Sequence, residues 1–258
     1  MTTALPDLAD LPAVGLDELV GSSALLTRVD RKYVLPRAAM AVVLDLAPDD
    51  TRVLEIGGAR SFGYTTDYLD TPELLTFRLA AHRRRRRFKV RERRYDATGA
   101  RYLEVKTRAG AATVKRRLEG GYVADGRLAD EGARFVTDAL VGSGVAPGDA
   151  VARLAPALTV RYDRTTLQLP GDDTRVTVDR ALRWRCPDGA VLSRPDVVVV
   201  ETKTPGAPSS LDRLLWSLGH RPRPMSKYAT GLAALDPDLP GNRWTRTLRE
   251  HLSGRGGR

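Results

Sequence analysis

A basic stretch between His82 and Tyr95 contains the side chains best suited to bind an anion. It begins with five consecutive arginines at 83–87. From there, every second position is basic: Arg87, Lys89, Arg91 and Arg93. This alternation is typical of a β-strand with two different faces, and cations about 7 Å apart on one face repel each other unless they are solvated or meet an anion. The stretch predicts a strand that either lies exposed, as a basic or nucleic-acid-binding surface, or contacts a polyanion.

Charged residues share one parity in several other segments that read as strands. They are Arg28, Asp30 and Lys32; Glu104 and Lys106; Lys115 and Arg117; Arg164; Arg175 and Asp179; and Glu201 and Lys203. A sheet cannot bury a charged face against an apolar core, but the charged side could line a water-filled barrel whose apolar outer face is covered by helices. For any single strand, a solvated outer face with surface ion pairs remains the alternative.

A mostly cationic lining with a few carboxylates favours one class of ligand. Arginine and lysine bind phosphate oxygens, and carboxylates hold Mg²⁺ or Mn²⁺, which bridge phosphates in phosphoryl transfer. We therefore expect a container for a phosphorylated polyanion and a divalent metal. The arginines at 83–87 are assigned in part to a solvated patch at its entrance.

Periodicity and turn residues predict the elements that position these side chains. Strands are expected at 25–35, 61–70, 87–95, 101–108, 113–119, 154–170, 174–185 and 196–204. Helices are expected at 15–20, 36–47, 72–82, 125–144, 209–219 and from Ser226 to residue 235, with Ser226 as the N-cap and Lys227 in the first turn. The fold class is α+β, an antiparallel sheet with helices packed outside. The predicted organisation is an arm with a short helix at 1–22, a domain at 23–236 and a basic, flexible tail at 237–258.

Bulk composition restricts the class of protein. The chain has 258 residues, a formal net charge of +10 and a single cysteine, Cys186, so it cannot form an internal disulfide. No signal peptide and no apolar run of about 18 residues is apparent, which predicts a cytoplasmic protein without a transmembrane segment. Phosphate-binding glycine loops are missing, the three histidines lack metal-ligand spacing, and Cys186 has no activating partner. The oligomeric state is left open.

Nine segments together resemble the VTC-type polyphosphate polymerase domain of the CYTH, or triphosphate tunnel metalloenzyme, superfamily. In chain order they are DRKYVL, YTTDYLDTPEL, RRFKVRERRY, YLEVKTR, TVKRRL, LTVRYDRTTLQLP, RVTVDRALRW, VVVVETKT and SKYATGL. The resemblance implies an eight-stranded antiparallel tunnel with helices outside. It also implies transfer of the ATP γ-phosphate to a growing polyphosphate chain, with Mn²⁺ or Mg²⁺ as cofactor and ATP and polyphosphate or triphosphate as partners.

The resemblance also implies roles for individual positions. Phosphate or nucleotide binding is implied for Lys32, Lys89, Arg91, Lys106, Lys115, Arg164 and Arg175. Glu201 resembles the metal-binding glutamate, and Ser226 and Lys227 resemble the Ser-Lys pair near the transferred phosphate, so that Lys227, Ser226 and Lys32 are the expected catalytic residues.

One departure and two alternatives accompany this interpretation. Tunnel hydrolases of the superfamily open with E-x-E-x-K, whereas this chain has Arg28-x-Asp30-x-Lys32, which favours the polymerase branch over a two-metal hydrolase. A triphosphate or nucleoside triphosphate hydrolase and a non-catalytic polyphosphate-binding module remain the alternatives. Nucleic acid is disfavoured, because the basic strand offers only Phe88 and Tyr95 for stacking and Phe88 lies on the opposite parity.

Overall fold

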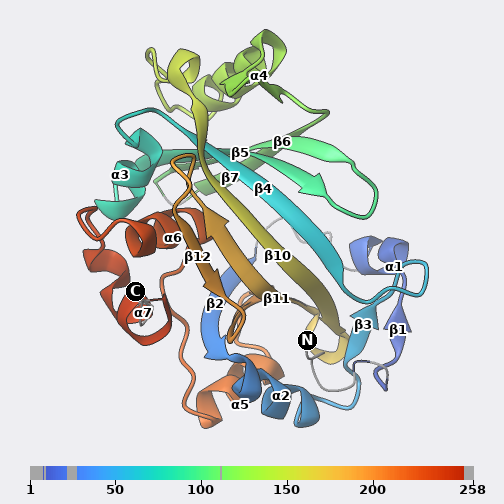
Figure 1. The fold of residues 1–258 in the computed structure, drawn as a ribbon. Coiled ribbons are helices and arrows are strands. Elements are labelled where there is room, and N and C mark those ends of the chain that lie inside the picture. Colours follow the sequence, from blue (N-terminus) through green and yellow to red (C-terminus); the bar gives the residue numbers. More distant parts are fainter. Residues whose placement is uncertain (1–7, 9, 22–27, 111, 253–258) are drawn as a thin grey trace. The chain divides into compact units, whose positions relative to one another are not determined.

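The protein is described by a computed structural model that covers residues 8, 10–21, 28–110 and 112–252. Its chain forms two compact units that interleave along the sequence (Figure 1). The first unit comprises residues 1–62, 162–182 and 193–225, and the second comprises residues 63–161, 183–192 and 226–258. Strands β10 (Ala155–Leu169) and β11 (Thr174–Arg185) contribute residues to both. Nothing in the sequence indicated this division.

The first unit is built on strands that neighbour one another in the order β2, β13, β11 and β10. Strand β2 (Val29–Pro36) pairs antiparallel with β13 (Val197–Thr204), which pairs antiparallel with β11. Helices α2 (Arg37–Asp45) and α5 (Ser210–Ser217) follow β2 and β13 in the chain. The smaller elements are β1 (Ala13–Val14), α1 (Leu16–Gly21) and β3 (Arg52–Leu54).

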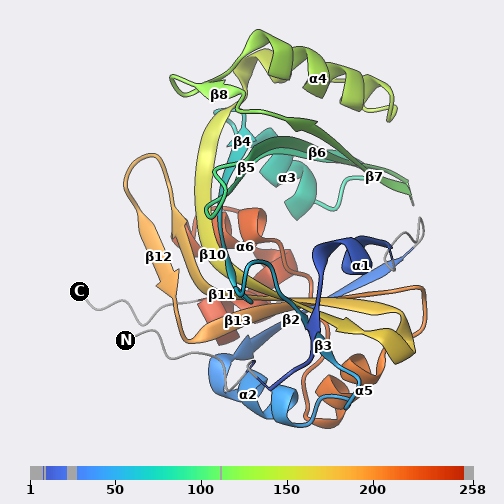
Figure 2. The ribbon, with the colours of Figure 1, turned by 90° about the vertical axis from the view of Figure 1, so that its right-hand side faces the viewer.

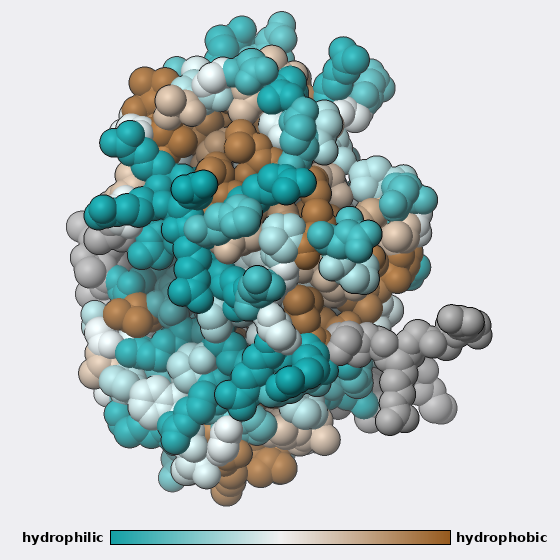
Figure 3. Space-filling model, turned by 90° about the vertical axis from the view of Figure 1, so that its left-hand side faces the viewer, coloured by the Kyte–Doolittle hydropathy of each residue, from teal (hydrophilic) through white to brown (hydrophobic). Residues whose placement is uncertain are grey.

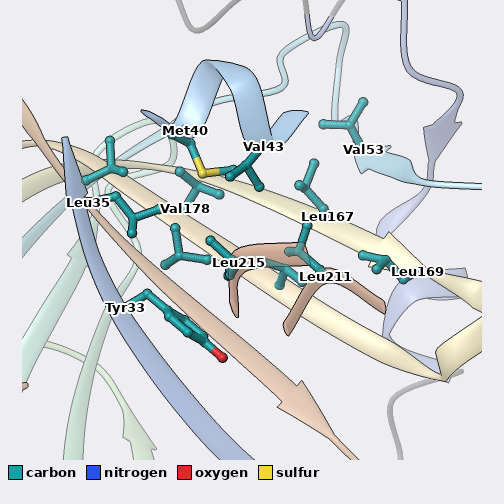
Figure 4. Packing of buried hydrophobic residues seen from close by; sticks show 13 residues of the cluster. Tyr33, Leu35, Met40, Val43, Val53, Leu167, Leu169, Val178, Leu211 and Leu215 are labelled. Atoms are coloured by element: carbon teal, nitrogen blue, oxygen red, sulfur yellow. The ribbon is translucent and has the colours of Figure 1, made fainter. Parts of the chain in front are cut away.

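Apolar side chains from both helices and from the strands form the core of the first unit (Figure 4). Met40 and Val43 of α2, Leu211 and Leu215 of α5, and Leu35 of β2 are all buried there. Because side chains alternate along a strand, packing one parity against these helices leaves the charged parity on the opposite face.

The second unit contains β4 (Phe62–Asp70), β5 (Arg86–Tyr95), β6 (Arg101–Ala109) and β7 (Ala112–Glu119), joined as antiparallel neighbours. Its helices are α3 (Leu75–Ala81), α4 (Asp130–Val141), α6 (Lys227–Leu235) and α7 (Thr245–Thr247). Helix α4 runs alongside β5, β6 and β7 (Figure 2) and packs on their apolar parity, which includes Phe88, Val90, Leu103 and Val105. The remaining strands are the β8–β9 hairpin (Val123–Ala124 and Arg127–Leu128) and β12 (Val191–Arg194), which pairs with β11.

The α+β class and the eight predicted strands are confirmed, in the neighbour order β2-β13-β11-β10-β4-β5-β6-β7. Residues 25–27 of the first predicted strand lie outside the described residues. The sequence did not predict the short strands β1, β3, β8, β9 and β12, which are two to four residues long. It also predicted no packed structure after residue 236, yet residues 242–252 are helical. Trp244 is buried there because its ring packs on Phe77, with the ring centroids 5.9 Å apart.

Candidate functional site

In the first unit, Glu201 lies between two lysines on the charged face of β13. It stands directly opposite Lys32 of β2 and accepts a hydrogen bond from the Lys32 ammonium. Lys203 Nζ is 3.5 Å from the other carboxylate oxygen. Burial by itself would raise the pKa of Glu201, but the charges of Lys32 and Lys203 hold that pKa well below its usual range. The Glu201 carboxylate is therefore ionised at neutral pH.

The same unit holds a second buried carboxylate, which pairs with an arginine across β10 and β11. Arg164 donates from Nε and Nη2 to the two carboxylate oxygens of Asp179, at 2.6 and 2.9 Å. Asp179 is only 1% exposed, so this two-bond geometry neutralises a buried carboxylate. Arg175 lies directly opposite Lys203, and burial together with the charges of Arg28 and Arg164 lowers its pKa. Positive charge therefore exceeds what the carboxylates offset on this face.

In the second unit, one buried glutamate forms ion pairs with three basic side chains. Glu104 of β6 is 3% exposed, and its carboxylate contacts Arg91 at 2.6 Å, Arg93 at 3.9 Å and the ammonium of Lys115. Burial alone would raise the pKa of Glu104, but these three positive charges more than offset that effect and lower it. Glu104 thus fixes the side chains of β5, β6 and β7 relative to one another.

Three lysines form a row across the same strands. Lys89 of β5 lies directly opposite Lys106 of β6, and Lys106 lies directly opposite Lys115 of β7. Like charges at directly opposed positions destabilise a sheet. Lys89 also donates a hydrogen bond to Ser226 Oγ at 2.6 Å, which connects the row to the start of α6. A row of this kind suits an anion with several charged oxygens.

Helix α6 begins where the sequence predicted. Ser226 is the N-cap and its Oγ accepts a hydrogen bond from the backbone N–H of Ala229, while Lys227 is the first helical residue. The indole N–H of Trp184 donates to the Lys227 carbonyl at 2.7 Å. The Tyr228 hydroxyl donates to Asp70, a buried carboxylate that also accepts the backbone N–H groups of Thr76 and Phe77 in α3. The first turn of α6 is thereby fixed on both sides.

Sequence reasoning did not single out an aromatic group at the far end of this charged face. Tyr64, Tyr95 and Tyr102 of β4, β5 and β6 are half-buried neighbours, with ring centroids 4.9 Å apart for the first pair and 5.6 Å for the second. The guanidinium of Arg93 lies 5.4 Å from the Tyr64 ring centroid, and that of Arg117 lies 4.5 Å from the Tyr102 centroid. The available signal was parity, since Tyr95 continues the alternation that starts at Arg87.

The carboxylates of the two charged faces are the side chains that could hold a divalent metal. Among residues 8, 10–21, 28–110 and 112–252, no three histidine, cysteine, aspartate or glutamate side chains are grouped closely enough to enclose an ion. Glu104 is committed to three cations, and Asp30 is exposed. Glu201 contacts Lys32 and Lys203, so it could hold a divalent ion only together with anionic groups of a ligand, since the described residues provide no protein cage.

The predicted site residues fall into two sets. Lys32, Glu201, Arg164 and Arg175 belong to the first unit, and Lys89, Arg91, Lys106, Lys115, Ser226 and Lys227 belong to the second. Within the units, the structure pairs Lys32 with Glu201 and Lys89 with Ser226. The prediction that all of them line one lumen remains a prediction.

Comparison with known proteins gives a family match and several similar solved structures. A family model described as the VTC domain matches residues 27–236. No curated protein matches the sequence. Similar solved structures include a proposed adenylate cyclase from Bacillus halodurans, with 12% identity, a TM-score of 0.47 and coverage of 77% of this chain and 93% of the other. A proposed adenylyl cyclase from Hippeastrum, described as having a dominant triphosphatase activity, has 16% identity, a TM-score of 0.48 and coverage of 87% of this chain and 100% of the other.

Within the part of the chain that the structure describes, no helix has both the length and the apolar character needed to cross a bilayer.

Proposed function

Because the chain belongs to the VTC domain family, we propose that it is a metal-dependent polyphosphate polymerase that transfers the γ-phosphate of ATP to a growing polyphosphate chain. Its proposed phosphate-binding residues are Lys32, Lys89, Arg91, Lys106, Lys115, Arg164 and Arg175. Lys227, Ser226 and Lys32 are the proposed catalytic residues.

The observation that carries the proposal is the lysine row that ends at a helix N-terminus. Lys89, Lys106 and Lys115 are directly opposed on neighbouring strands, and Lys89 contacts the Ser226 hydroxyl at the start of α6. Lysine ammonium groups and the backbone N–H groups of a first helical turn both bind phosphate oxygens. Phosphoryl transfer requires mainly such positioning and charge neutralisation, and little covalent chemistry from the protein.

Glu201 is the residue proposed to hold the metal. Its carboxylate is ionised and contacts Lys32 and Lys203, so a cation would have to compete with two ammonium groups unless phosphate oxygens bind those ammonium groups. Metal and substrate are therefore expected to bind together. When bound, Mn²⁺ or Mg²⁺ would neutralise charge on the phosphate oxygens.

The three tyrosines support a nucleotide as the phosphate donor. Tyr64, Tyr95 and Tyr102 lie on the same face of the sheet as Lys89 and Lys106. Nucleobases stack on aromatic rings of this kind. Inorganic triphosphate has no base that could stack on these rings. ATP is therefore the proposed donor.

Incubation of the purified chain with ATP and Mn²⁺ tests this function. Gel electrophoresis detects polyphosphate, and a colorimetric assay detects free phosphate in the same sample. Polyphosphate ladders that depend on ATP and metal are the expected result. Release of phosphate without polyphosphate would indicate a hydrolase, and the absence of both products would indicate a binding module.

A further inference from the structure

Two arginines extend the charged row of the second unit beyond its lysines. Arg87 lies two residues before Lys89 on β5, and Arg108 lies two residues after Lys106 on β6. Arg87 and Arg108 are directly opposed, as Lys89 and Lys106 are. Since residues two apart on a strand share a face and stand about 7 Å apart, the arginine pair continues the same cationic face by one step.

Two further arginines meet at the end of α3, close to this pair. The carbonyl of Ala80 accepts a hydrogen bond from the backbone N–H of Arg83 at 3.3 Å and another from the guanidinium of Arg243 at 3.0 Å. A shared acceptor places these two arginines beside each other. Arg243 also lies over the ring of Trp244, with 6.0 Å between its guanidinium carbon and the ring centroid.

Electrostatic coupling makes these four arginines one cluster. Burial and then the charges of Arg108 and Arg243 lower the pKa of Arg87. Burial and then the charges of Arg83 and Arg108 lower the pKa of Arg243. Arg87 and Arg243 are therefore close enough to the other arginines of the cluster for those charges to destabilise their own charged forms.

The described part of the chain supplies no carboxylate to offset this charge. None of the four forms an ion pair there, and the side-chain hydrogen bonds of three of them go to backbone carbonyls: Arg84 for Arg87, Gly110 for Arg108 and Ala80 for Arg243. Nε of Arg243 is buried and has no hydrogen-bond partner among the described residues. An unpartnered buried donor costs free energy that a bound acceptor would recover. Hydrophilic side chains also gather on the face drawn in Figure 3, on the side of α3.

The backbone at Arg83 adds strain at the same place. Helix α3 ends in a Schellman motif, with the N–H of Arg84 bonded to the Leu79 carbonyl and the N–H of Arg83 bonded to that of Ala80. Arg83 occupies the left-handed position of this motif with φ of 53°, where glycine is the favoured residue. An arginine here is unfavourable for the backbone and adds a fourth positive charge.

We propose that Arg83, Arg87, Arg108 and Arg243 bind the extended part of an inorganic polyphosphate chain, beyond the phosphates held by Lys89 and Lys106. The assignment rests on the proposed function for its ligand. Arg243 lies outside residues 27–236, the segment matched by the family model, so the site is not defined by family membership. A nucleic acid fits less well, because the aromatic ring in contact with the cluster, that of Trp244, is only 3% exposed and offers no face to a base.

Binding measurements on the full-length chain, without ATP or metal, test the proposal. Long-chain inorganic polyphosphate and inorganic triphosphate are titrated separately. We expect Arg108→Gln and Arg243→Gln each to weaken polyphosphate binding by about tenfold, which is the effect of one charge-assisted hydrogen bond, and to change triphosphate binding by less than about twofold. Arg85→Gln is the matched control, because it removes the same charge from an exposed residue of the same run.

Arg83→Gly separates binding from folding. Glycine suits the left-handed backbone, so the melting temperature should rise while polyphosphate affinity falls.

The proposal is overturned if Arg85→Gln weakens polyphosphate binding as much as the cluster variants do, since bulk charge would then explain the effect. It is also overturned if triphosphate or a single-stranded oligonucleotide loses affinity in parallel with polyphosphate. If Arg243→Gln does not fold, the exposed Arg108 still supplies the test. A chain that makes no polyphosphate from ATP but passes these binding tests would refute only the polymerase function.

Discussion

Lys89 Nζ donates a hydrogen bond to Ser226 Oγ over 2.6 Å, although 137 residues separate them in the chain. The same oxygen accepts the N–H of Ala229 at 3.2 Å. A hydroxyl oxygen has two lone pairs, and both are used by these donors. The hydroxyl proton of Ser226 is therefore not used by these two bonds, and we propose that it donates to a phosphate oxygen of the substrate.

Substitution of Ser226 tests whether the hydroxyl acts on substrate or only caps the helix. An alanine at an N-cap costs about 1 kcal/mol of stability, whereas a glycine costs only a few tenths. We expect Ser226→Gly to keep nearly full stability in urea unfolding and to lose about tenfold or more in ATP turnover, the effect of one charge-assisted hydrogen bond. Turnover that follows stability across the glycine and alanine variants would instead assign Ser226 a capping role alone.

Glu104 is expected to stabilise the second unit by neutralising cations. Glu104→Gln keeps the size of the side chain but removes the negative charge that contacts the buried Arg93 and its neighbours Arg91 and Lys115. Breaking a buried pair in this way costs about 3–5 kcal/mol, and the partial exposure of Arg91 and Lys115 favours the lower end. Chemical denaturation measures the loss. Glu119→Gln, the same change at an exposed position of β7, should cost less than about 0.5 kcal/mol.

The stability lost in Glu104→Gln should also depend on pH. The pKa of Glu104 in the folded protein is below its ordinary value of 4.5, so the folded state binds this proton more weakly than the unfolded chain does. Its contribution is fully present above that ordinary value and is lost as the pH falls below it. The stability difference between wild type and Glu104→Gln should therefore shrink on acidification from pH 7 to pH 3. A difference that stays constant over this range would contradict the assignment.

Local pattern was sufficient to predict some of these features. The alternation from Arg87 to Tyr95 predicted a charged strand face, and Ser226 before an apolar run predicted the N-cap of α6; both predictions are confirmed. The alternation along residues 196–204 likewise placed Glu201 and Lys203 on one face, and both lie on the charged face of β13.

The partners of these residues could not be predicted, because they depend on strand register and on long-range packing. Lys32 and Glu201 are 169 residues apart, and Tyr228 and Asp70 are 158 residues apart. The end of α3 agrees with the helix predicted at 72–82, but the left-handed backbone of Arg83 was not predicted, since arginine rather than glycine occupies that position. Arg243 joins that cluster from a stretch in which the sequence showed no helical pattern.

Gly231 is predicted to be required by the ring of Trp184. A Cβ atom added at this position of α6 would lie well under 3.0 Å from Cδ1 and Nε1 of Trp184. Helix propensity alone favours alanine over glycine by about 1 kcal/mol, whereas overpacking a core costs about 1–3 kcal/mol. We therefore expect Gly231→Ala to lower the melting temperature and to reduce turnover, because Trp184 also holds the Lys227 carbonyl. An increase in melting temperature would show that the ring can move aside.

Glu201→Gln tests the proposed metal residue. The substitution keeps the shape of the side chain and removes the charge, so metal-dependent turnover should be abolished while the protein still folds. Metal binding can be read separately by titrating Mn²⁺ in the presence of inorganic triphosphate and following the paramagnetic effect of the bound ion. Undiminished activity and Mn²⁺ binding at low metal concentration would move the site to another carboxylate. Glu119→Gln again serves as the control for loss of one negative charge.

Lys227 gives the sharpest test of the proposed chemistry, because of its place at the start of α6. The first turn of a helix offers free backbone N–H groups and a dipole that favours an anion, so an ammonium there opposes the dipole unless a phosphate is bound. We expect Lys227 to neutralise charge on the phosphoryl group as it moves.

Lys227→Ala should then reduce turnover by about 10²- to 10³-fold, the usual effect of removing one transition-state contact. Nucleotide affinity should change far less, since the proposed phosphate contacts of Lys89, Arg91 and Lys106 remain. Turnover with Mn²⁺ and nucleotide affinity, measured on the same preparation, distinguish the cases, and Lys227→Arg controls for charge without the compact ammonium. Near-wild-type turnover, or equal losses of binding and turnover, would show that Lys227 does not act in the transition state.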